Sequence, residues 1–460
     1  MARPYTYLAS RVLFPVHEWV KGHSTSRYLR FLERSQWWSP TQLERHRVER
    51  LRLLLTDAVS HVPYYRRVFK ELKYDPRGLT AVSELRALPF LTKAVVRASF
   101  GDLTAENGPP LKRSNTGGSS GEPLVFMVGR ERVSHDVAGR WRATRWWGLD
   151  IGDPEIVVWG SPIEIRTQGR AQALRDRVFR TELLSAFEMS DAKLDTFVQR
   201  VRARRPKMLF GYPSALSLIA RHSRKREIPM RDLGVKVAFV TAERLYDDQR
   251  EDIASIFGCD VANGYGGRDA GFVAHECPSG GMHLSAEDII VELVDEQGSP
   301  VPPGNPGEVV VTHLATRGFP FVRYRTGDIA IFDDRPCACG RSLPLLREIQ
   351  GRATDFVVAQ DGTTMHGLAL IYVLRDLPGI AAFKIVQETM DSTRVLLQPA
   401  PDFDPKCVDV IQRGLRARLG AGVRVVVDLL PELPPDHSGK FRYVVSNLSG
   451  RHHTTATDPA

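Results

Sequence analysis

Cysteine is scarce in this sequence, and long uncharged hydrophobic runs are lacking. Five cysteines among 460 residues are too few for a disulfide scaffold, and their clustering favours a reducing compartment. No uncharged stretch approaches the ~20 residues that a membrane helix needs. The apolar stretch near the N-terminus is interrupted by Arg11, Pro15, His17 and Glu18, which is not typical of a secretory signal. We therefore expect a cytoplasmic protein with no stable membrane insertion.

The sequence also lacks internal repeats and biased tracts. Its 42% hydrophobic and 25% charged residues are ordinary for a globular protein, and its length allows two or three domains. The net charge of +9 comes mostly from scattered arginine. The basic runs 202–205 and 221–226 are either solvated helix faces, which we favour, or a nucleic-acid patch. We expect no nucleic-acid partner, although such a surface would attract an anionic substrate such as ATP.

Helical spacing dominates residues 1–100, where prolines separate the segments. Near the N-terminus, Leu8, Val12, Val16 and Trp19 share one face of an amphipathic segment. We expect this face to pack on the core or on a partner rather than to anchor the chain in a membrane.

Strands and helices then alternate, which favours an α/β fold with a mainly parallel, helix-flanked sheet. We predict strands at 155–159, 207–210 and 235–240, and helices at 131–147, 192–204 and 214–225. From about 282 onward, short strands at 289–294, 308–312, 321–324 and 329–332 are joined by Gly/Pro turns. This second pattern predicts an antiparallel meander or barrel within a large domain, 1–350.

A small α+β domain is predicted at 351–450. It combines a hairpin (381–387 and 393–398), a helix at 405–419 and a strand at 423–430. The polar residues 451–460 are predicted to form a disordered tail.

A glycine- and hydroxyl-rich stretch, Ser114 to Gly121, leaves almost no side-chain bulk, so its backbone N–H groups can wrap an anion such as polyphosphate. It lacks the Gly-Lys-Ser/Thr ending of a Walker loop, so a phosphate-neutralising lysine must come from elsewhere. The alternative is a flexible surface loop.

Three further motifs carry groups that suit a nucleotide. Lys440, after a glycine, can be brought to a phosphate as a point charge, or can be a solvated surface lysine. In 263–269, Tyr265 can stack on a purine and Asp269 can hold Mg²⁺, or the tyrosine can simply pack in a tight loop. Asp328, after a strand, can accept both hydroxyls of a ribose or can be solvated.

Two short segments supply a potential metal site. Cys277, His283, Cys337 and Cys339 form a three-thiolate, one-imidazole set that suits tetrahedral Zn²⁺. Four protein ligands leave no open position, so such an ion would be structural. Buried thiols without a metal are the alternative, and Cys259 and Cys407 are expected to be core residues.

The order and spacing of these motifs resemble the adenylate-forming superfamily, and within it the phenylacetate-CoA ligase-like branch that includes capsular-polysaccharide-associated adenylating proteins. The resemblance covers about residues 55–445, from the segment His61-Val62-Pro63-Tyr64-Tyr65-Arg66 to Lys440. It implies an acid-thiol ligase that uses ATP and Mg²⁺ to convert a carboxylic acid into an acyl-adenylate, with release of pyrophosphate, and passes the acyl group to CoA.

The resemblance also implies roles for individual residues. The ATP β- and γ-phosphates would be held by Thr116, Gly117, Gly118, Ser119, Ser120 and Gly121, and adenine would contact Gly264, Tyr265 and Gly266. Asp328 would bind the ribose, and Arg352 would belong to a hinge motif with Asp355 as the pivot of a mobile C-terminal domain. The ammonium group of Lys440 would bridge the substrate carboxylate and the α-phosphate during adenylate formation. The acyl pocket would be lined in part by Tyr212, Ala242, Gly267 and Phe272. Tyr212 and Phe272 would suit an aromatic or medium acyl group, or either can simply pack.

The sequence departs from the family pattern in two places. Arg268-Asp269 stands where the family usually has a Ser/Thr-Glu pair, and residues 362–367 match the usual CoA ligase segment poorly. Two alternatives therefore remain beside a CoA ligase: transfer of the acyl group to a carrier protein or an amine, and a nucleotide-binding protein with degraded catalysis.

Overall fold

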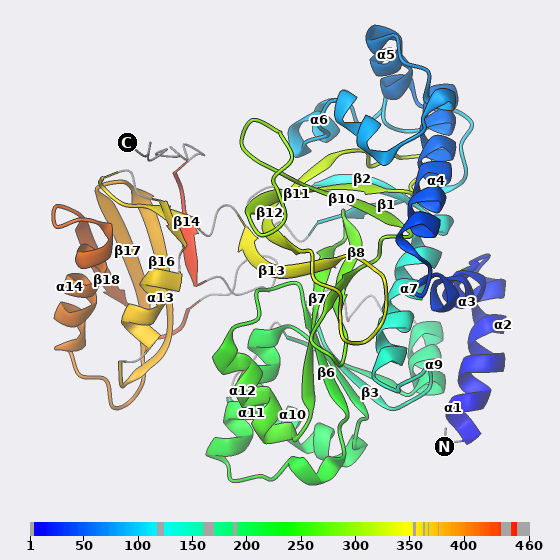
Figure 1. Cartoon of the computed structure of the whole chain (residues 1–460). Coiled ribbons are helices and arrows are strands. Elements are labelled where there is room, and N and C mark those ends of the chain that lie inside the picture. The colour runs from blue at the N-terminus through cyan, green and yellow to red at the C-terminus, as the bar shows by residue number, and fades with distance from the viewer. Residues whose placement is uncertain are drawn as a thin grey trace. The chain divides into compact units, whose positions relative to one another are not determined.

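Two units, Met1–Gln350 and Gly351–Ala460, make up the computed structural model of the chain (Figure 1). The structure describes residues 4–116, 124–159, 170–186, 191–352, 356–361, 364–366, 368–375, 377–433 and 443–448. Each unit is described by itself below.

The large unit begins with helices, as the spacing of apolar residues in 1–100 predicts. They are α1 (Pro4–Leu8), α2 (Phe14–Val20), α3 (Thr25–Ser35), α4 (Pro40–His61), α5 (Pro63–Leu72) and α6 (Lys93–Ala98), with short irregular turns between them. Ser39 and Gln42 form a capping box at the start of α4, and Pro40 occupies its first turn. The chain is extended at Val62, before Pro63, so α4 ends there and α5 begins.

The N-terminal amphipathic face does not pack on the core. Its side chains are exposed, from 44% at Leu8 to 79% at Trp19. The opposite side of this region contributes Phe14 to a buried cluster with α3 and the long helix α7 (Arg130–Trp146). The expectation that this face packs on the core is therefore wrong, while packing on a partner, like the less favoured membrane anchor, stays a prediction. Within the part of the chain that the structure describes, no helix is both long enough and apolar enough to span a membrane.

One sheet of eleven strands runs through the large unit, in the order β10-β11-β12-β13-β9-β8-β7-β6-β5-β3-β4. The strands are β3 (Glu155–Val158), β4 (Thr181–Leu184), β5 (Met208–Gly211), β6 (Val237–Thr241), β7 (Asp260–Gly267), β8 (Gly271–Glu276), β9 (Met282–Leu284), β10 (Ile289–Val294), β11 (Pro306–His313), β12 (Tyr324–Asp333) and β13 (Leu345–Arg352). Pairing is parallel from β4 to β7 and antiparallel from β7 to β9, so the parallel sheet continues into the antiparallel part.

Helices cover both faces of the parallel half (Figure 1). One face packs on α10 (Asp191–Arg204), α11 (Pro213–Lys225) and α12 (Asp247–Phe257), and α7 covers the other. Among the described residues, this region also contains α9 (Arg170–Phe179). These elements agree with the predicted alternation of strands and helices, and the mixed sheet with a small second unit is the predicted fold class.

The predicted meander is present as β10, β11 and β12, which pair antiparallel. One detail differs, because the expected strands at 321–324 and 329–332 are a single strand, β12, that begins at Tyr324. Arg323 adopts a left-handed conformation with a φ of 48°, and this turn separates the buried side chains of Phe321 and Val322 from the strand.

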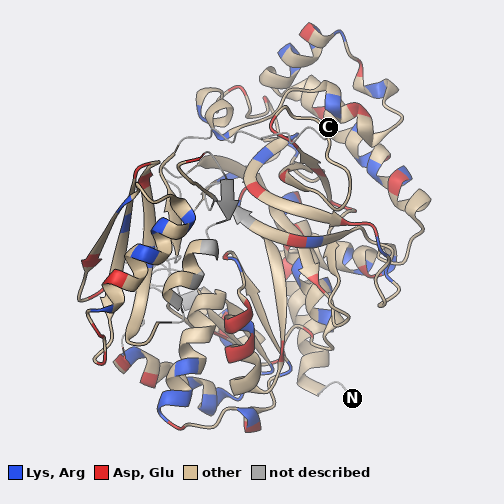
Figure 2. Cartoon of the chain, turned by 60° about the vertical axis from the view of Figure 1, so that its left-hand side comes forward, with Lys and Arg blue, Asp and Glu red and all other residues tan. Residues whose placement is uncertain are grey.

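Basic and acidic side chains lie together on the outer helices of the parallel half (Figure 2). In the run 221–226, Arg221 and Arg224 pair with Asp252 on α12, and Arg226 pairs with Asp195 on α10. In the run 202–205, Arg205 pairs with Asp232. Much of the positive charge of both runs is therefore compensated locally.

The small unit contains a four-stranded sheet in the order β18-β17-β16-β19 and a separate two-stranded hairpin, β14-β15. Its elements are β14 (Phe356–Val358), β15 (Thr364–His366), α13 (Leu368–Arg375), β16 (Ile380–Thr389), β17 (Ser392–Pro399), α14 (Cys407–Leu419), β18 (Arg424–Leu429) and β19 (Val444–Ser446). Helices α13 and α14 pack on each other and on the four-stranded sheet. Buried Ile385, Leu397, Ile411 and Leu415 give this unit a core of its own.

Candidate functional site

A short hairpin frames the glycine-rich stretch. Strands β1 (Leu111–Asn115) and β2 (Val125–Gly129) pair antiparallel, and Thr116 follows β1 directly. The Thr116 N–H donates to the carbonyl of Leu124 at 2.9 Å, and the Leu124 N–H donates to Thr116 Oγ1 at 2.9 Å. Thr116 thus ties the ends of the two strands together. The other predicted phosphate-binding residues, Gly117 to Gly121, lie outside the described residues.

The predicted adenine-binding residues lie on β7, where it turns back into β8. Gly264, Tyr265 and Gly266 are consecutive on this strand, and Gly266 faces Phe272 across the pair. A Cβ atom on Gly266 would stand only 2.2 Å from the carbonyl oxygen of Gly271, so the close approach of the two strands requires glycine. The turn between them carries Gly267, Arg268 and Asp269.

Two tyrosine hydroxyls join two of the predicted motifs, 263–269 and the segment that carries Asp328. Tyr265 on β7 donates to Asp328 Oδ2 on β12 at 2.8 Å, and Tyr324 on β12 donates to Asp269 Oδ2 at 2.7 Å. Burial, followed by the charge of Asp328, raises the pKa of Tyr265 well above its usual value, so its hydroxyl stays a donor. The structure therefore brings together Tyr265, Asp328 and Asp269, which the sequence assigned to adenine, ribose and Mg²⁺.

A buried arginine fixes the turn that carries Asp269. Arg132, on α7, is 1% exposed and donates to the carbonyls of Arg268 and Asp269 at 2.7 and 2.8 Å. Its guanidinium lies over the rings of Phe126 and Phe321. This role could not be predicted from the sequence, because a charged residue on a helix usually faces water.

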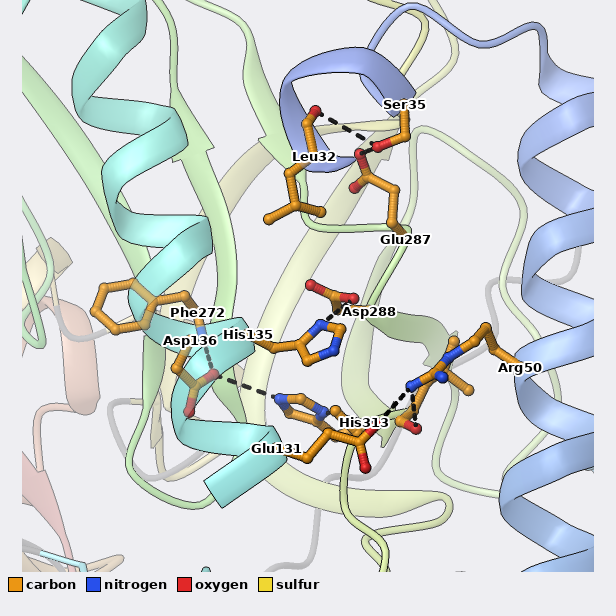
Figure 3. A network of polar contacts seen from close by, with 12 residues as sticks. Leu32, Ser35, Arg50, Glu131, His135, Asp136, Phe272, Glu287, Asp288 and His313 are labelled. Carbon is orange, nitrogen blue, oxygen red and sulfur yellow. Dashed lines mark hydrogen bonds and ion pairs between the residues drawn. The ribbon is translucent and has the colours of Figure 1, made fainter. Parts of the chain in front are cut away.

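A network of polar side chains lies between α7 and the start of β8 (Figure 3). Asp136 Oδ1 accepts from the Phe272 N–H at 3.4 Å and lies 3.4 Å from His313 Nε2. Burial opposes ionisation of Asp136, yet the hydrogen bond from His313 and the charge of Arg132 hold its pKa below the usual value. The neighbouring His135 pairs with Asp288 in the same way. This network holds the start of β8, and with it Phe272, against α7.

A hollow lies beside the residues predicted to bind the nucleotide, within the large unit. Part of it is open to solvent, and its walls include Gly264, Phe272, Thr241, Phe210 and His275. Phe272 was predicted to line an acyl pocket. Of the other residues predicted there, Tyr212 stacks on Trp159 with ring centroids 4.3 Å apart, and Ala242 follows Thr241 with a φ of 71°. Gly267 is exposed on the β7–β8 turn.

The four predicted metal ligands converge. The donor atoms of Cys277, His283, Cys337 and Cys339 all lie within 4.8 Å of one another. His283 Nδ1 is 3.4 Å from the carbonyl of Leu343, and Nε2 is 3.1 Å from Cys339 Sγ, so the ring turns one nitrogen toward the thiols.

The chemistry of this cluster, called the Cys3His cluster below, fits a metal ion. Burial lowers the pKa of His283 to about 4, so its imidazole is neutral near pH 7, which is the form that binds metals. A Cβ atom on Gly281 would lie 2.5 Å from Cys337 Sγ, so glycine is needed for the loop to approach the thiol this closely. The arrangement offers three sulfur atoms and one nitrogen, the donors that a structural zinc site uses.

The remaining predicted residues belong to the end of the large unit and to the small unit. Arg352 is the last residue of β13, and its side chain lies outside what the structure describes. Asp355 and Lys440 also lie outside the described residues. Just before Arg352, Arg244 Nη1 donates to the carbonyl of Gln350 at 2.9 Å and so holds the end of the large unit.

Two family descriptions match the chain. "AMP-binding enzyme" matches residues 184–316, which include the β7–β8 turn, and "CapK C-terminal domain" matches residues 357–447, which include Lys440. Phenylacetate-coenzyme A ligase of Thermus thermophilus is 25% identical over 86% of this chain and 95% of its own length. Protein CapK of Staphylococcus aureus is 22% identical over 84% of this chain and 85% of its own length.

Solved structures share the fold. A 2-hydroxyisobutyryl-CoA ligase in the postadenylation state, in complex with R3-HIB-AMP, is similar with a TM-score of 0.70 and 20% identity, over 90% of this chain and 92% of that one. Its likeness shows the arrangement of a large domain with a mixed sheet and a small C-terminal domain. Fold, family matches and motifs agree, and the chain belongs to the AMP-binding, adenylate-forming superfamily, in the phenylacetate-CoA ligase and CapK branch.

Proposed function

We propose that the protein uses ATP to activate a carboxylic acid as an acyl-adenylate and then passes the acyl group to the thiol of CoA. The observation that supports this best is the pair of hydrogen bonds Tyr265–Asp328 and Tyr324–Asp269, which join two motifs, 263–269 and the one with Asp328, into one site. Membership of an AMP-forming ligase family supports the same reading.

The two steps follow from the chemistry of carboxylates. A carboxylate is a poor acyl donor because its leaving group would be an oxide. In the first step its oxygen attacks the α-phosphorus of ATP, the bond to the β-phosphate breaks, and pyrophosphate leaves. In the second step a thiolate attacks the acyl carbon, the bond to the phosphate oxygen breaks, and AMP leaves. Catalysis then consists of aligning the reactants and compensating phosphate charge.

Each predicted group has a part in this scheme. Thr116 and the glycine-rich stretch would bind the β- and γ-phosphates, Asp328 the ribose, and Asp269 the Mg²⁺ ion that neutralises phosphate charge. Asp269 is one methylene shorter than the glutamate usual in the family. The hydrogen bond from Tyr324 and the contacts of Arg132 to the turn fix its position, which argues against a degraded site.

CoA is the acceptor that we favour. The 2-hydroxyisobutyryl-CoA ligase has a similar fold in complex with 2-HIB-AMP and CoA, with a TM-score of 0.57 at 21% identity. Transfer to a carrier protein or an amine is the second candidate, and the match of residues 357–447 to the CapK C-terminal domain supports it, because the small unit is where the sequence departs from CoA ligases.

An acid panel tests the proposal. We expect ATP-dependent pyrophosphate release with at least one acid, and formation of a thioester when CoA is added. The Asp269→Asn variant should show a lower rate that rises when Mg²⁺ is increased, because the amide is a weaker ligand. Transfer of the acyl group to a carrier protein or an amine, but not to CoA, would select the second candidate. Absence of pyrophosphate release with every acid, together with ATP binding, would select a nucleotide-binding protein instead.

We also propose that the Cys3His cluster holds a structural Zn²⁺ ion. Cys277 lies in the loop between β8 and β9, His283 lies on β9, and the other two ligands lie in the segment between β12 and β13. The ion would therefore tie the β8–β9 loop to the segment that precedes β13. Hydrogen bonds from the backbone and side chain of Arg341 lower the pKa of the Cys339 thiol despite its burial, which favours the thiolate that binds zinc.

Metal analysis of the purified protein should find close to one zinc per chain. The Cys337→Ser variant should lose most of it and should unfold at a lower temperature, because binding energy at such a site stabilises the fold. Cys407→Ser removes a buried thiol from the small unit and serves as the matched control, with zinc retained. A metal-free wild-type protein that keeps its stability in the presence of a chelator would contradict the assignment.

A further inference from the structure

His275 is a buried histidine on the wall of the hollow. It lies on β8, where it is paired with Gly264 of β7 on one side and with His283 of β9 on the other. The residue is 3% exposed, and its ring is stacked on Phe272 with centroids 5.4 Å apart and planes 15° apart. Gly264 has no side chain to cover the ring, since a Cβ atom there would stand 3.6 Å from His275 Cδ2.

Neither ring nitrogen of His275 has a hydrogen-bond partner among the described residues. Three other buried histidines of the large unit are paired with a carboxylate: His135 with Asp288, His313 with Asp136, and His222 with Asp195. A fourth, His283, contacts the Leu343 carbonyl and Cys339. A buried polar group without a partner costs about 1–3 kcal/mol. His275 therefore departs from the pattern of its own fold, at a place where it faces the hollow.

The rest of the wall is mostly apolar. Phe210, Phe239 and Phe272 contribute rings, which suit a carbon skeleton. Arg140 also lines the hollow, but it pairs with Glu155 and its guanidinium lies 4.4 Å from the centre of the Phe210 ring. Because that charge is compensated, the wall gives little support to a second carboxylate on the ligand. Thr144 and Thr241 line the hollow as well, and the Thr144 hydroxyl donates to the carbonyl of Arg140. On this wall, His275 is the buried side chain whose polar atoms have no partner among the described residues.

We propose that His275 determines acyl specificity by hydrogen-bonding a neutral oxygen, a hydroxyl or a carbonyl, on the acyl chain of the acid. The inference rests on the proposed function and names its substrate class: small hydroxy or oxo acids are preferred to hydrocarbon acids of the same shape. An imidazole carries at least one N–H in either protonation state, so it offers a donor to such an oxygen. Gly264 precedes Tyr265 directly, which places the hollow beside the residues predicted to bind the nucleotide.

When a hydrocarbon acid binds, the imidazole N–H stays buried without a partner. The site therefore disfavours an acid that lacks the oxygen.

Matched acids test the inference. Each hydrocarbon acid is compared with its hydroxy and oxo analogues, for example butyrate with 3-hydroxybutyrate and 3-oxobutyrate, and phenylacetate with 4-hydroxyphenylacetate. We expect kcat/KM for pyrophosphate release to be about 10- to 100-fold higher with an oxygen-bearing member, the factor that one buried unpaired donor produces. Comparing the hydroxy analogue with the oxo analogue shows whether a hydroxyl or a carbonyl is preferred.

Variants assign the preference to the ring. In His275→Leu the ratio should fall to near one while the hydrocarbon acid is used at least as well as before. His275→Gln, which keeps a donor, should retain part of the preference. His222→Leu removes a buried imidazole that pairs with Asp195 on the outer helices and should leave the ratio unchanged.

Direct binding separates this inference from the proposed function. Acid binding is measured by calorimetry on the full chain, without turnover. If hydroxy or oxo acids bind more tightly and His275→Leu removes the difference, the inference holds even when no acid is adenylated. It is overturned if hydrocarbon and oxygen-bearing acids bind and react alike, if His275→Leu keeps the preference, or if a dicarboxylic acid is preferred through Arg140. If the leucine variant fails to fold, the preference of the wild-type protein for oxygen-bearing acids and the preference of His275→Gln test the inference.

Discussion

Replacing Lys440 with alanine is expected to lower acid-dependent pyrophosphate release by about 100- to 1,000-fold, the loss typical when one preorganised group that stabilises transition-state charge is removed. In the proposed reaction, negative charge builds up on the α-phosphate as the carboxylate attacks. No Walker lysine accompanies the glycine-rich stretch, so this charge depends on a cation supplied from elsewhere in the chain. Lys440 lies within the region that matches the CapK C-terminal domain.

The two half-reactions should respond differently to this change. Transfer from a chemically prepared acyl-adenylate to CoA does not form the bond to phosphorus, so Lys440→Ala should keep most of that activity. Lys406→Ala, an exposed lysine before α14 in the same unit, is the matched control and should leave both steps intact. Wild-type rates of adenylate formation in Lys440→Ala, or an equal loss of both steps, would contradict the assigned role.

Local pattern predicted much of the fold. The spacing of apolar residues located helix α7 and strands such as β6 and β10 within a few residues, because each element buries one face of its own sequence. The sequence could not show that Arg323 turns the chain ahead of β12, since this left-handed conformation belongs to a residue type that usually avoids it.

The ligand types of the Cys3His cluster could also be recognised before the structure. Cysteine and histidine are rare enough for four of them in two short segments to stand out, and those segments do converge. Arg132 and His275 could not be recognised in this way. Both side chains are buried, Arg132 against the β7–β8 turn and His275 against Phe272. The sequence carries no local signal for a charged or polar side chain that faces inward.

The buried ion pair Arg142–Glu287 could not be predicted from the sequence either. Its loss should have the largest effect on stability. Arg142 Nη1 lies 2.7 Å from Glu287 Oε1, and the side chains are 1% and 0% exposed. Ser35, on α3, donates to the same oxygen at 2.7 Å (Figure 3). Helix α3, helix α7 and the segment before β10 therefore meet at one carboxylate.

Arg142→Met should lower the free energy of unfolding of the large unit by about 3–5 kcal/mol, measured by urea denaturation, because it leaves the Glu287 carboxylate buried without its cation. The exposed pair Arg66–Glu106 has a similar N–O distance, 2.9 Å, and provides the control: Arg66→Met should cost less than about 1 kcal/mol. The double variant Arg142→Met/Glu287→Leu should recover much of the loss, because apolar side chains can replace a buried pair with little cost. If the double variant were as unstable as Arg142→Met, the loss would come from the packing of the arginine stem and its contact with Trp146, and not from an uncompensated charge.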